Sequence, residues 1–188
     1  MLLRVTIFVV CSAIVHGATA EEAIREAREA LQSAATEYGD DHPATAMRMR
    51  ELALAFEQAG YHRQAEYYAA QALAKLEARL GSEDFNLVPV LNVLAEAYAG
   101  EQRNSEALPI AMRAVRIGPA AGRYYGTALH NAASLLYRLG RFVESEELFV
   151  RALAAMEATL PAGHPYMEST RMALKRVQKG ARQTALVR

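Results

Sequence analysis

Apolar positions along most of the chain are spaced three or four residues apart, which is the spacing of amphipathic α-helices. The spacing is interrupted near Gly60, Gln102 and Gly140, where we expect tight turns. Each interruption separates two apolar-periodic stretches, so it predicts a helix, a turn and an antiparallel helix. The predicted building unit is therefore a helical hairpin.

The three predicted hairpins are copies of one pattern. The second copy begins 42 residues after the first, and the third 38 residues after the second. The corresponding residues are Leu52, Ala53, Phe56, Ala65 and Ala72; then Leu94, Ala95, Tyr98, Ala107 and Ala114; then Ala132, Ala133, Leu136, Ser145 and Ala152. Alanine leaves room for two helices to cross closely, so we expect these positions to set the distance between helices.

This arrangement resembles the tetratricopeptide repeat (TPR), and the 42-residue spacing with His42-Pro43 and His164-Pro165 at helix starts resembles its kinesin-light-chain-type variant. The resemblance covers nearly all of residues 21–183. It implies an all-α, right-handed superhelical solenoid of TPR-like helical hairpins with about eight helices. Three features depart from the pattern: Gln102 stands where glycine is favoured, Ser145 where alanine is favoured, and residues 118–122 replace a longer linker. These departures leave the pitch of the stack between the second and third hairpins undetermined by the sequence.

The two ends of the chain predict its domain organisation. Residues 1–20 combine Arg4, an apolar run of about 11 residues and the small triplet Ala18-Thr19-Ala20, which is the layout of a cleaved secretory signal peptide. The run is shorter than the roughly 20 residues of a membrane-spanning helix. We expect residues 21–183 to form the repeat domain, with a leading helix, three hairpins and a polar C-terminal capping helix, and 184–188 a tail. The predicted location is periplasmic or secreted; the alternative is a chain held to the membrane by an uncleaved N-terminal segment.

Composition narrows the class of protein. Apolar residues make up 52% of the chain, which argues against a disordered polymer. The formal net charge is zero, so a nucleic-acid partner is disfavoured. Cys11 is the sole cysteine and lies in the predicted signal peptide, which leaves no disulfide in the remainder.

No residue pattern indicates catalysis, a cofactor or a metal. His42 and His164 precede prolines at repeat linkers, where we expect a local structural role, and His62 follows a turn, where we expect solvation. None of the histidines has the spacing of a metal site. Serine and cysteine residues lack an identifiable base, and a Gly-rich phosphate loop is missing from the sequence. A pocket that joins two titratable groups with displaced pKa values would favour an enzyme; a shallow open groove would not.

Binding is expected on the concave face, which the first helix of each hairpin lines in such solenoids. The candidate partner-binding residues are Met47, Arg50, Leu54, Glu57, Asn92, Glu96, His130, Asn131, Ser134, Tyr137 and Arg138. The resemblance implies that the amides of Asn92 and Asn131 hydrogen-bond an extended peptide backbone. His130 is open to two interpretations, a ligand contact or a satisfied polar residue near the hairpin interface. A protein or peptide segment is the predicted partner of a non-catalytic exported scaffold.

Two alternatives remain open at this point. One is an accessory subunit of a cell-envelope enzyme or assembly. The other is a self-associating structural unit, because residues 21–41 carry seven acids and two bases, whereas residues 164–188 carry six bases and one acid. The basic C-terminal tail also permits attachment to an anionic surface, which we rank third.

Overall fold

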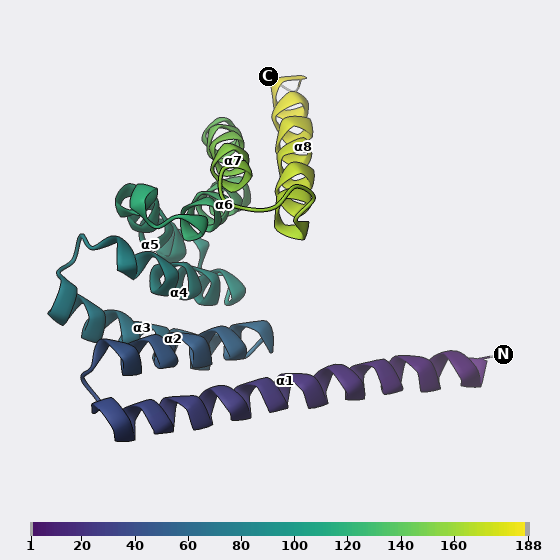
Figure 1. Ribbon diagram of the computed structural model, residues 1–188. Helices are drawn as coiled ribbons and strands as arrows, with labels where there is room; N and C mark the ends of the chain where they lie inside the picture. Colours follow the sequence, from purple (N-terminus) through teal and green to yellow (C-terminus); the bar gives the residue numbers. More distant parts are fainter. Residues whose placement is uncertain (1, 187–188) are drawn as a thin grey trace.

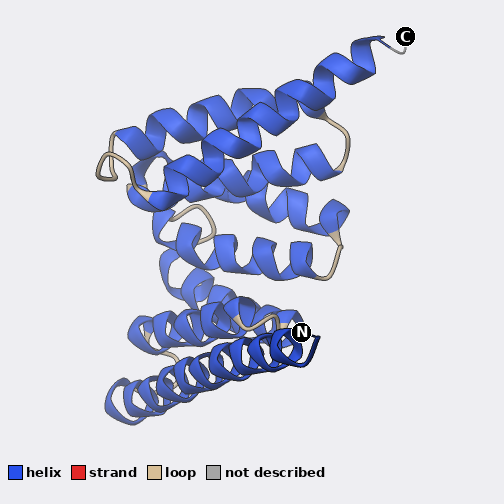
Figure 2. Ribbon diagram, turned by 90° about the vertical axis from the view of Figure 1, so that its right-hand side faces the viewer, coloured by secondary structure: helices blue, strands red, loops and turns tan. Residues whose placement is uncertain are grey.

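Helices make up nearly all of the protein. The computed structural model describes the backbone of residues 2–186 and the side chains of residues 20–181. The α-helices are α1 (Leu2–Tyr38), α2 (Pro43–Gln58), α3 (His62–Leu80), α4 (Val88–Gly100), α5 (Asn104–Ile117), α6 (Arg123–Arg138), α7 (Phe142–Glu157) and α8 (Pro165–Leu186). Two short 3-10 helices, η1 (Phe85–Leu87) and η2 (Gly118–Ala120), precede α4 and α6. No strand occurs within residues 2–186 (Figure 2). The predicted all-α fold with eight helices is confirmed.

The helices stack as successive hairpins. α2 pairs with α3, α4 with α5, and α6 with α7, while α1 and α8 cover the two ends of the stack (Figure 1). The first helices also contact one another in sequence, α2 with α4, α4 with α6 and α6 with α8. This row of first helices forms one face of the molecule.

The repeat alanines lie where the helices cross. Ala53, Ala65, Ala95, Ala107 and Ala133 are all fully buried. Larger side chains fill the space beside them, including Leu52, Leu91 and Leu129, each at most 1% exposed. Burial of such a side chain stabilises the fold by about 1.5–3 kcal/mol, so the stack depends on contacts between neighbouring hairpins.

The three hairpin turns share one geometry although their residues differ. Gly60, Gln102 and Gly140 all have positive φ, at 79°, 63° and 75°. The following N–H in each case bonds back to the carbonyl five residues earlier, as in Arg103 to Tyr98 at 3.0 Å and Arg141 to Leu136 at 2.9 Å. These bonds close the helix end and hold Gln102 in the left-handed region that glycine usually occupies. Its departure from the pattern therefore leaves the turn unchanged.

Ser145, the second departure, is also accommodated. Its side chain is fully buried, and its Oγ donates a 2.7 Å hydrogen bond to the Ala133 carbonyl. A buried hydroxyl with a partner carries little penalty, so the α6–α7 hairpin keeps the close approach of its equivalents.

The N-terminal helix is continuous from Leu2 to Tyr38 and projects well beyond α2 (Figure 1). The side chains of residues 1–19, which include most of the predicted signal peptide, lie outside the described residues. Cleavage near residue 20 therefore stays a prediction. At the other end, α8 continues to Leu186, three residues past the predicted end of the repeat domain. In the described part of the chain, no helix is both long enough and apolar enough to cross a membrane.

Candidate functional site

A polar pocket lies on the face formed by the first helices, and we call it the central pocket. Its volume is about 360 Å³. The residues that line it are Glu57, His62, Ala95, Glu96, Ala99, Gly100, His130, Asn131, Ser134, Leu135 and Arg138. They come from α2, α3, α4 and α6, so four helices of three hairpins build one site. Six of the candidate partner-binding residues predicted from the sequence line this pocket.

Glu96 is the most unusual group in the central pocket. Asn131 Nδ2 donates a 2.7 Å hydrogen bond to its Oε1, linking α6 to α4. The pKa of the Glu96 carboxyl is raised to about 7, mainly by burial and to a smaller extent by the nearby Glu57 carboxylate, whereas the Asn131 bond lowers it. Among the described residues, no basic side chain pairs with Glu96. The carboxyl is thus held in a site that disfavours its negative charge.

His130 is also displaced toward its neutral form. Burial alone lowers the pKa of its imidazole to about 4. Its Nδ1 lies 2.9 Å from Thr170 Oγ1 of α8, and its ring packs edge-on against Phe149 at 5.3 Å between centroids. The contact with Thr170 agrees with the interpretation of His130 as a satisfied polar residue, whereas a ligand contact stays a prediction for a side chain that lines the pocket.

The central pocket therefore joins two titratable groups with displaced pKa values, the observation that would favour an enzyme. Desolvation is the largest cause for both groups, and it stabilises the neutral form of each. Within residues 20–181, no cluster of three or more metal-binding side chains occurs. The arrangement supplies a desolvated acid and a neutral imidazole; among the described residues that line the pocket, no hydrogen bond joins Ser134 to either of them.

His62, which we expected to be solvated, is part of the pocket wall. Its Nδ1 lies 2.7 Å from Glu57 Oε2, and its side chain is 30% exposed. The ring packs against Gly100, where an added Cβ would lie only 2.3 Å from Nδ1. The expectation was wrong because residue type and position after a turn do not reveal contact with Gly100, 38 residues away in the sequence.

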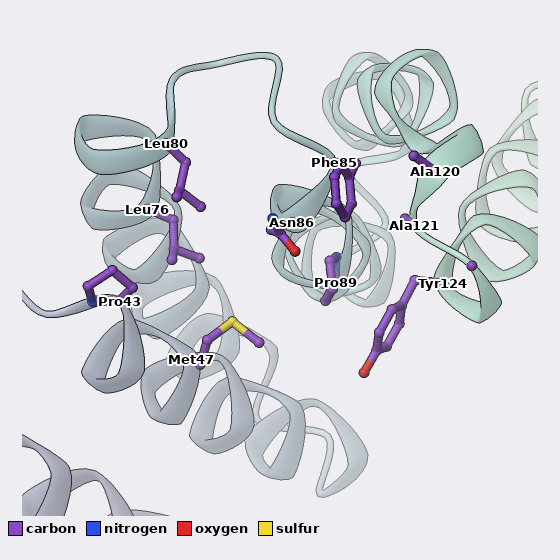
Figure 3. Close-up of a pocket in the computed structure, with 11 residues that line it drawn as sticks. Pro43, Met47, Leu76, Leu80, Phe85, Asn86, Pro89, Ala120, Ala121 and Tyr124 are labelled. Atoms are coloured by element: carbon purple, nitrogen blue, oxygen red, sulfur yellow. The ribbon is translucent and has the colours of Figure 1, made fainter.

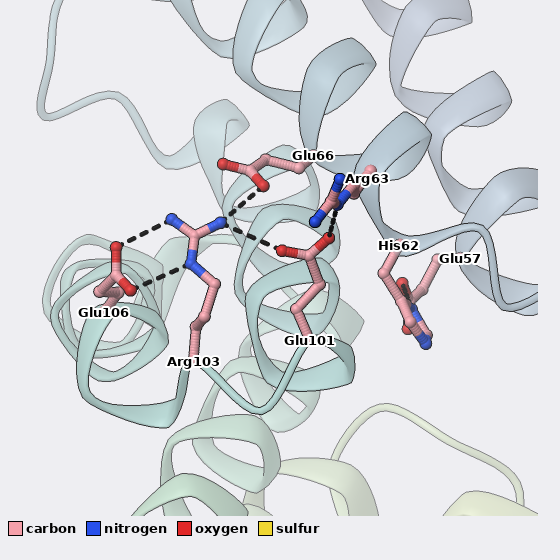
Figure 4. Close-up of polar contacts among 7 residues, drawn as sticks. All are labelled: Glu57, His62, Arg63, Glu66, Glu101, Arg103 and Glu106. Carbon is pink, nitrogen blue, oxygen red and sulfur yellow. Dashed lines mark hydrogen bonds and ion pairs between the residues drawn. The ribbon is translucent and has the colours of Figure 1, made fainter.

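An ion-pair cluster beside the pocket anchors the start of α3 (Figure 4). Arg103 Nη1 pairs with Glu66 at 2.8 Å and Glu101 at 3.2 Å, and its Nη2 pairs with Glu106 at 2.8 Å. Its guanidinium also stacks over the Tyr98 ring at 4.1 Å. Glu66 lies one turn after His62, so the cluster fixes the end of α3 that forms the pocket wall.

Asn92 and Arg50 lie on the same face but are largely enclosed. Asn92 is 4% exposed, and its Nδ2 donates a 3.1 Å bond to the Tyr124 carbonyl. The side chain of Arg50 is 11% exposed and lies 3.5 Å from Glu51. Leu54 is half-buried against the core. A role of these residues in partner contact stays a prediction, because the structure uses the Asn92 nitrogen internally.

Arg138 and Tyr137 are more accessible. Arg138 Nη1 donates to the Ala99 carbonyl at 3.0 Å and lies 3.4 Å from Asn104 Oδ1, which leaves its other nitrogens toward solvent. Tyr137 lines a neighbouring pocket of about 270 Å³ that also contains Ser134, His130 and Arg176. Accessible polar side chains on the face formed by the first helices therefore continue from the central pocket toward α8.

A second pocket, which we call the apolar pocket, lies at the other end of α4 (Figure 3). Its volume is about 590 Å³. It is lined by Pro43, Met47, Leu76, Leu80, Phe85, Asn86, Pro89, Ala120, Ala121, Gly122 and Tyr124. Only Met47 was among the candidates from the sequence. The short linker at residues 118–122 forms part of its wall. The departure of this linker from the repeat pattern is the sequence signal that could have indicated the apolar pocket.

The two remaining linker histidines have the local role that we expected. His42 Nδ1 accepts a 3.1 Å bond from the Ala44 N–H, and His164 Nδ1 accepts a 3.2 Å bond from the Tyr166 N–H. Both side chains cap the first turn of the helix that follows.

Comparisons with known proteins agree with this architecture. The family model described as tetratricopeptide repeat matches residues 126–166. Two crystal structures of a Podosopora anserina protein, described as a kinesin light chain with nearly identical TPR-like repeats, superpose with TM-scores of 0.70, for a form with one substitution, and 0.68. Both are 23% identical to this chain; they cover 89% of it and 81% and 82% of their own chains. BtubC (BKLC) from P. vanneervenii superposes with a TM-score of 0.64 at 16% identity, covering 88% of this chain and 82% of that one. No curated protein sequence matches the chain.

Proposed function

Because the chain folds as a tetratricopeptide-repeat solenoid of the kinesin-light-chain type, we propose that it is a non-catalytic scaffold that holds a peptide or flexible segment of another protein on its concave face. The observation that carries the proposal is the central pocket, in which residues of four helices from three hairpins meet. An extended segment laid across these helices would contact all three hairpins together. Repeat solenoids present such extended surfaces to partners.

Several groups in the pocket are suited to a polypeptide ligand. Ser134 is half-buried on its wall, and Arg138 keeps unbonded nitrogens beside it. A hydroxyl and a guanidinium hydrogen-bond backbone carbonyls or side-chain oxygens. Specificity would come from these few polar groups and from the shape of the pocket.

Site-specific photo-crosslinking tests this proposal. A benzophenone amino acid replaces Ser134 in the groove or, as the matched control, Val143 on α7, which is 69% exposed. We expect the Ser134 probe, in the producing cells, to form an adduct with one linear segment of a partner protein, identified by mass spectrometry. The Val143 probe should not form this adduct. Equal adducts at both positions, or none at Ser134, would contradict a concave-face function.

We also propose that residues 1–20 direct export and are then removed. The support is their sequence layout of a basic start, apolar run and small-residue triplet. N-terminal sequencing of the chain recovered outside the cytoplasm should begin near Glu21. A chain that begins at Met1 and sediments with membranes would support the alternative of an uncleaved N-terminal anchor.

Part of a cell-envelope enzyme is the second candidate function, favoured by one observation, the shared pocket of Glu96 and His130. A carboxyl with a pKa near 7 suits proton transfer at neutral pH. Glu96→Gln separates the two functions where a partner is known. If the parent has a catalytic activity that the variant loses while its affinity for the partner is unchanged, the enzyme is favoured. If neither protein shows activity and the affinity for the partner changes, the scaffold is favoured.

A further inference from the structure

The central pocket contains an uncompensated carboxyl. Glu96 accepts one hydrogen bond, from Asn131, and among the described residues nothing donates to its second oxygen. Arg138, which lines the pocket, directs its Nη1 to the Ala99 carbonyl and Asn104 instead. A desolvated carboxyl without a paired cation is favoured in its neutral form, so a cation that enters the pocket would stabilise the ionised form.

Among the described residues, none of the other elements around Glu96 supplies a positive charge that pairs with its carboxylate. α2 contributes Glu57, a second acid, which is paired with His62 of α3. α6 contributes the neutral His130 and the outward-bonded Arg138, and α8 contributes Tyr166, whose pKa is raised by burial and by the Glu96 charge. The charge that would complement this group is therefore a cation supplied from outside the described residues.

The apolar pocket lies on the same face of α4. Pro89 lines the apolar pocket and Glu96 the central pocket, seven residues apart, which is two helical turns. The rise of an α-helix places them roughly 10 Å apart along the axis. Three residues of extended chain span roughly the same distance. A single extended segment would therefore reach both pockets.

We propose that the central pocket binds a lysine or arginine side chain of the partner segment, while the apolar pocket holds a bulky apolar side chain about three residues away from it. The inference rests on the proposed concave-face function and adds the chemistry of the ligand. The basic side chain pairs with Glu96, and the negative charge of Glu57, which lines the same pocket, adds attraction. Leu80 and Phe85, 37% and 43% exposed at the apolar pocket, become covered by the apolar side chain.

Binding of the cation is coupled to release of a proton. The free protein holds Glu96 largely protonated below pH 7, and the bound cation favours its ionised form. Affinity for a lysine-containing segment therefore rises about tenfold between pH 6 and pH 8. A segment with norleucine in place of that lysine lacks the rise.

Selection of ligands from a random decapeptide library tests the inference. The full chain is immobilised at pH 8, and bound peptides are sequenced. Parallel selections use Glu96→Gln, which keeps the shape of the side chain, Ala120→Phe, which narrows the apolar pocket from its exposed rim, and Ser134→Trp, which obstructs the central pocket. Helical circular dichroism of each variant confirms folding.

The parent should enrich Lys or Arg at one position by about tenfold or more, with an apolar residue three positions away. Glu96→Gln should remove only the basic preference, and Ala120→Phe only the apolar preference. Peptides that bind the parent but not Ser134→Trp would support the concave-face function. If those peptides show no preference for a basic residue, or if the same preference is selected by Glu96→Gln, this inference is overturned while that function stands. An absence of enriched peptides, or equal binding to Ser134→Trp, overturns the concave-face function and this inference with it.

Discussion

The imidazole of His62 lies directly against Gly100, so closely that a Cβ at residue 100 would fall 2.3 Å from His62 Nδ1. Gly100→Ala should therefore displace the ring and break its contact with Glu57, lowering the free energy of unfolding by about 1–3 kcal/mol. Chemical denaturation measures the change. In a His62→Ala background the same substitution should cost much less, and an equal cost in both backgrounds would show that the contact is unimportant.

Gln102 occupies a left-handed conformation with φ of 63°. Because a side chain is strained in this region and glycine is not, Gln102→Gly should raise the free energy of unfolding by about 0.5–1 kcal/mol. The matched control is Gly140→Gln at the equivalent turn, which should lower it by about 1 kcal/mol. Opposite signs in urea denaturation are required; two changes of the same sign would contradict the assignment of strain.

Glu96 should make the stability of the fold depend on pH. Its pKa is raised from 4.5 to about 7, so its contribution is full below pH 4.5 and is lost as pH rises toward 7. Glu96→Gln lacks this loss. The unfolding free energy of the variant minus that of the parent should therefore rise by about 3 kcal/mol between pH 4.5 and 7. A difference that stays constant with pH would contradict the burial of a titrating carboxyl.

The contribution of His130 to the unfolding free energy depends on pH in the opposite direction. Its pKa is lowered from 6.5 to about 4, so its contribution is full above pH 6.5 and is lost as pH falls toward 4. In the parent the slopes of Glu96 and His130 cancel between pH 4.5 and 6.5. Glu96→Gln should expose the histidine slope, with stability rising by about 1.4 kcal/mol per pH unit in this interval. Adding His130→Gln to this variant should remove that slope; a slope that persists must come from other groups.

The buried hydroxyl of Ser145 should be nearly dispensable. Ser145→Ala removes its bond to the Ala133 carbonyl but leaves the smaller side chain found at Ala65 and Ala107, so the unfolding free energy should change by no more than about 1 kcal/mol. Ser145→Val adds volume at a fully buried crossing point and should cost about 1–3 kcal/mol. Thermal denaturation compares the two; a larger loss for alanine would mean that the hydrogen bond, not the close packing, dominates.

The fold was predictable because its signals are local and repeated. Ala53, Ala95 and Ala133 recur in register, and each marks a crossing between neighbouring helices. Even Gln102 did not disturb the assignment, since the turn is fixed by backbone hydrogen bonds that any residue can make.

The sequence predicted which face of the molecule carries the site, but not the contacts within it. Register placed Glu96 and Asn131 on the first helices, but the bond between them joins residues 35 positions apart and depends on how α4 packs against α6. Desolvation of Glu96 follows from that packing and leaves no mark in the sequence. The apolar pocket was missed for a similar reason, because part of its wall, Phe85, Asn86 and Ala120, comes from two 3-10 turns that the sequence shows only as linkers.

Within the row of first helices, each helix contacts the next, α2 with α4, α4 with α6 and α6 with α8. The face that they form is therefore built from a series of separate interfaces. A small rotation at one interface adds to those at the others, so the width of the concave face can change without unfolding any hairpin. A segment bound in the central pocket would contact α2, α3, α4 and α6 and would therefore restrain the interfaces between all three hairpins. The distance between α1 and α8 would then vary less when the segment is bound, which a pair of fluorophores on these two helices would measure.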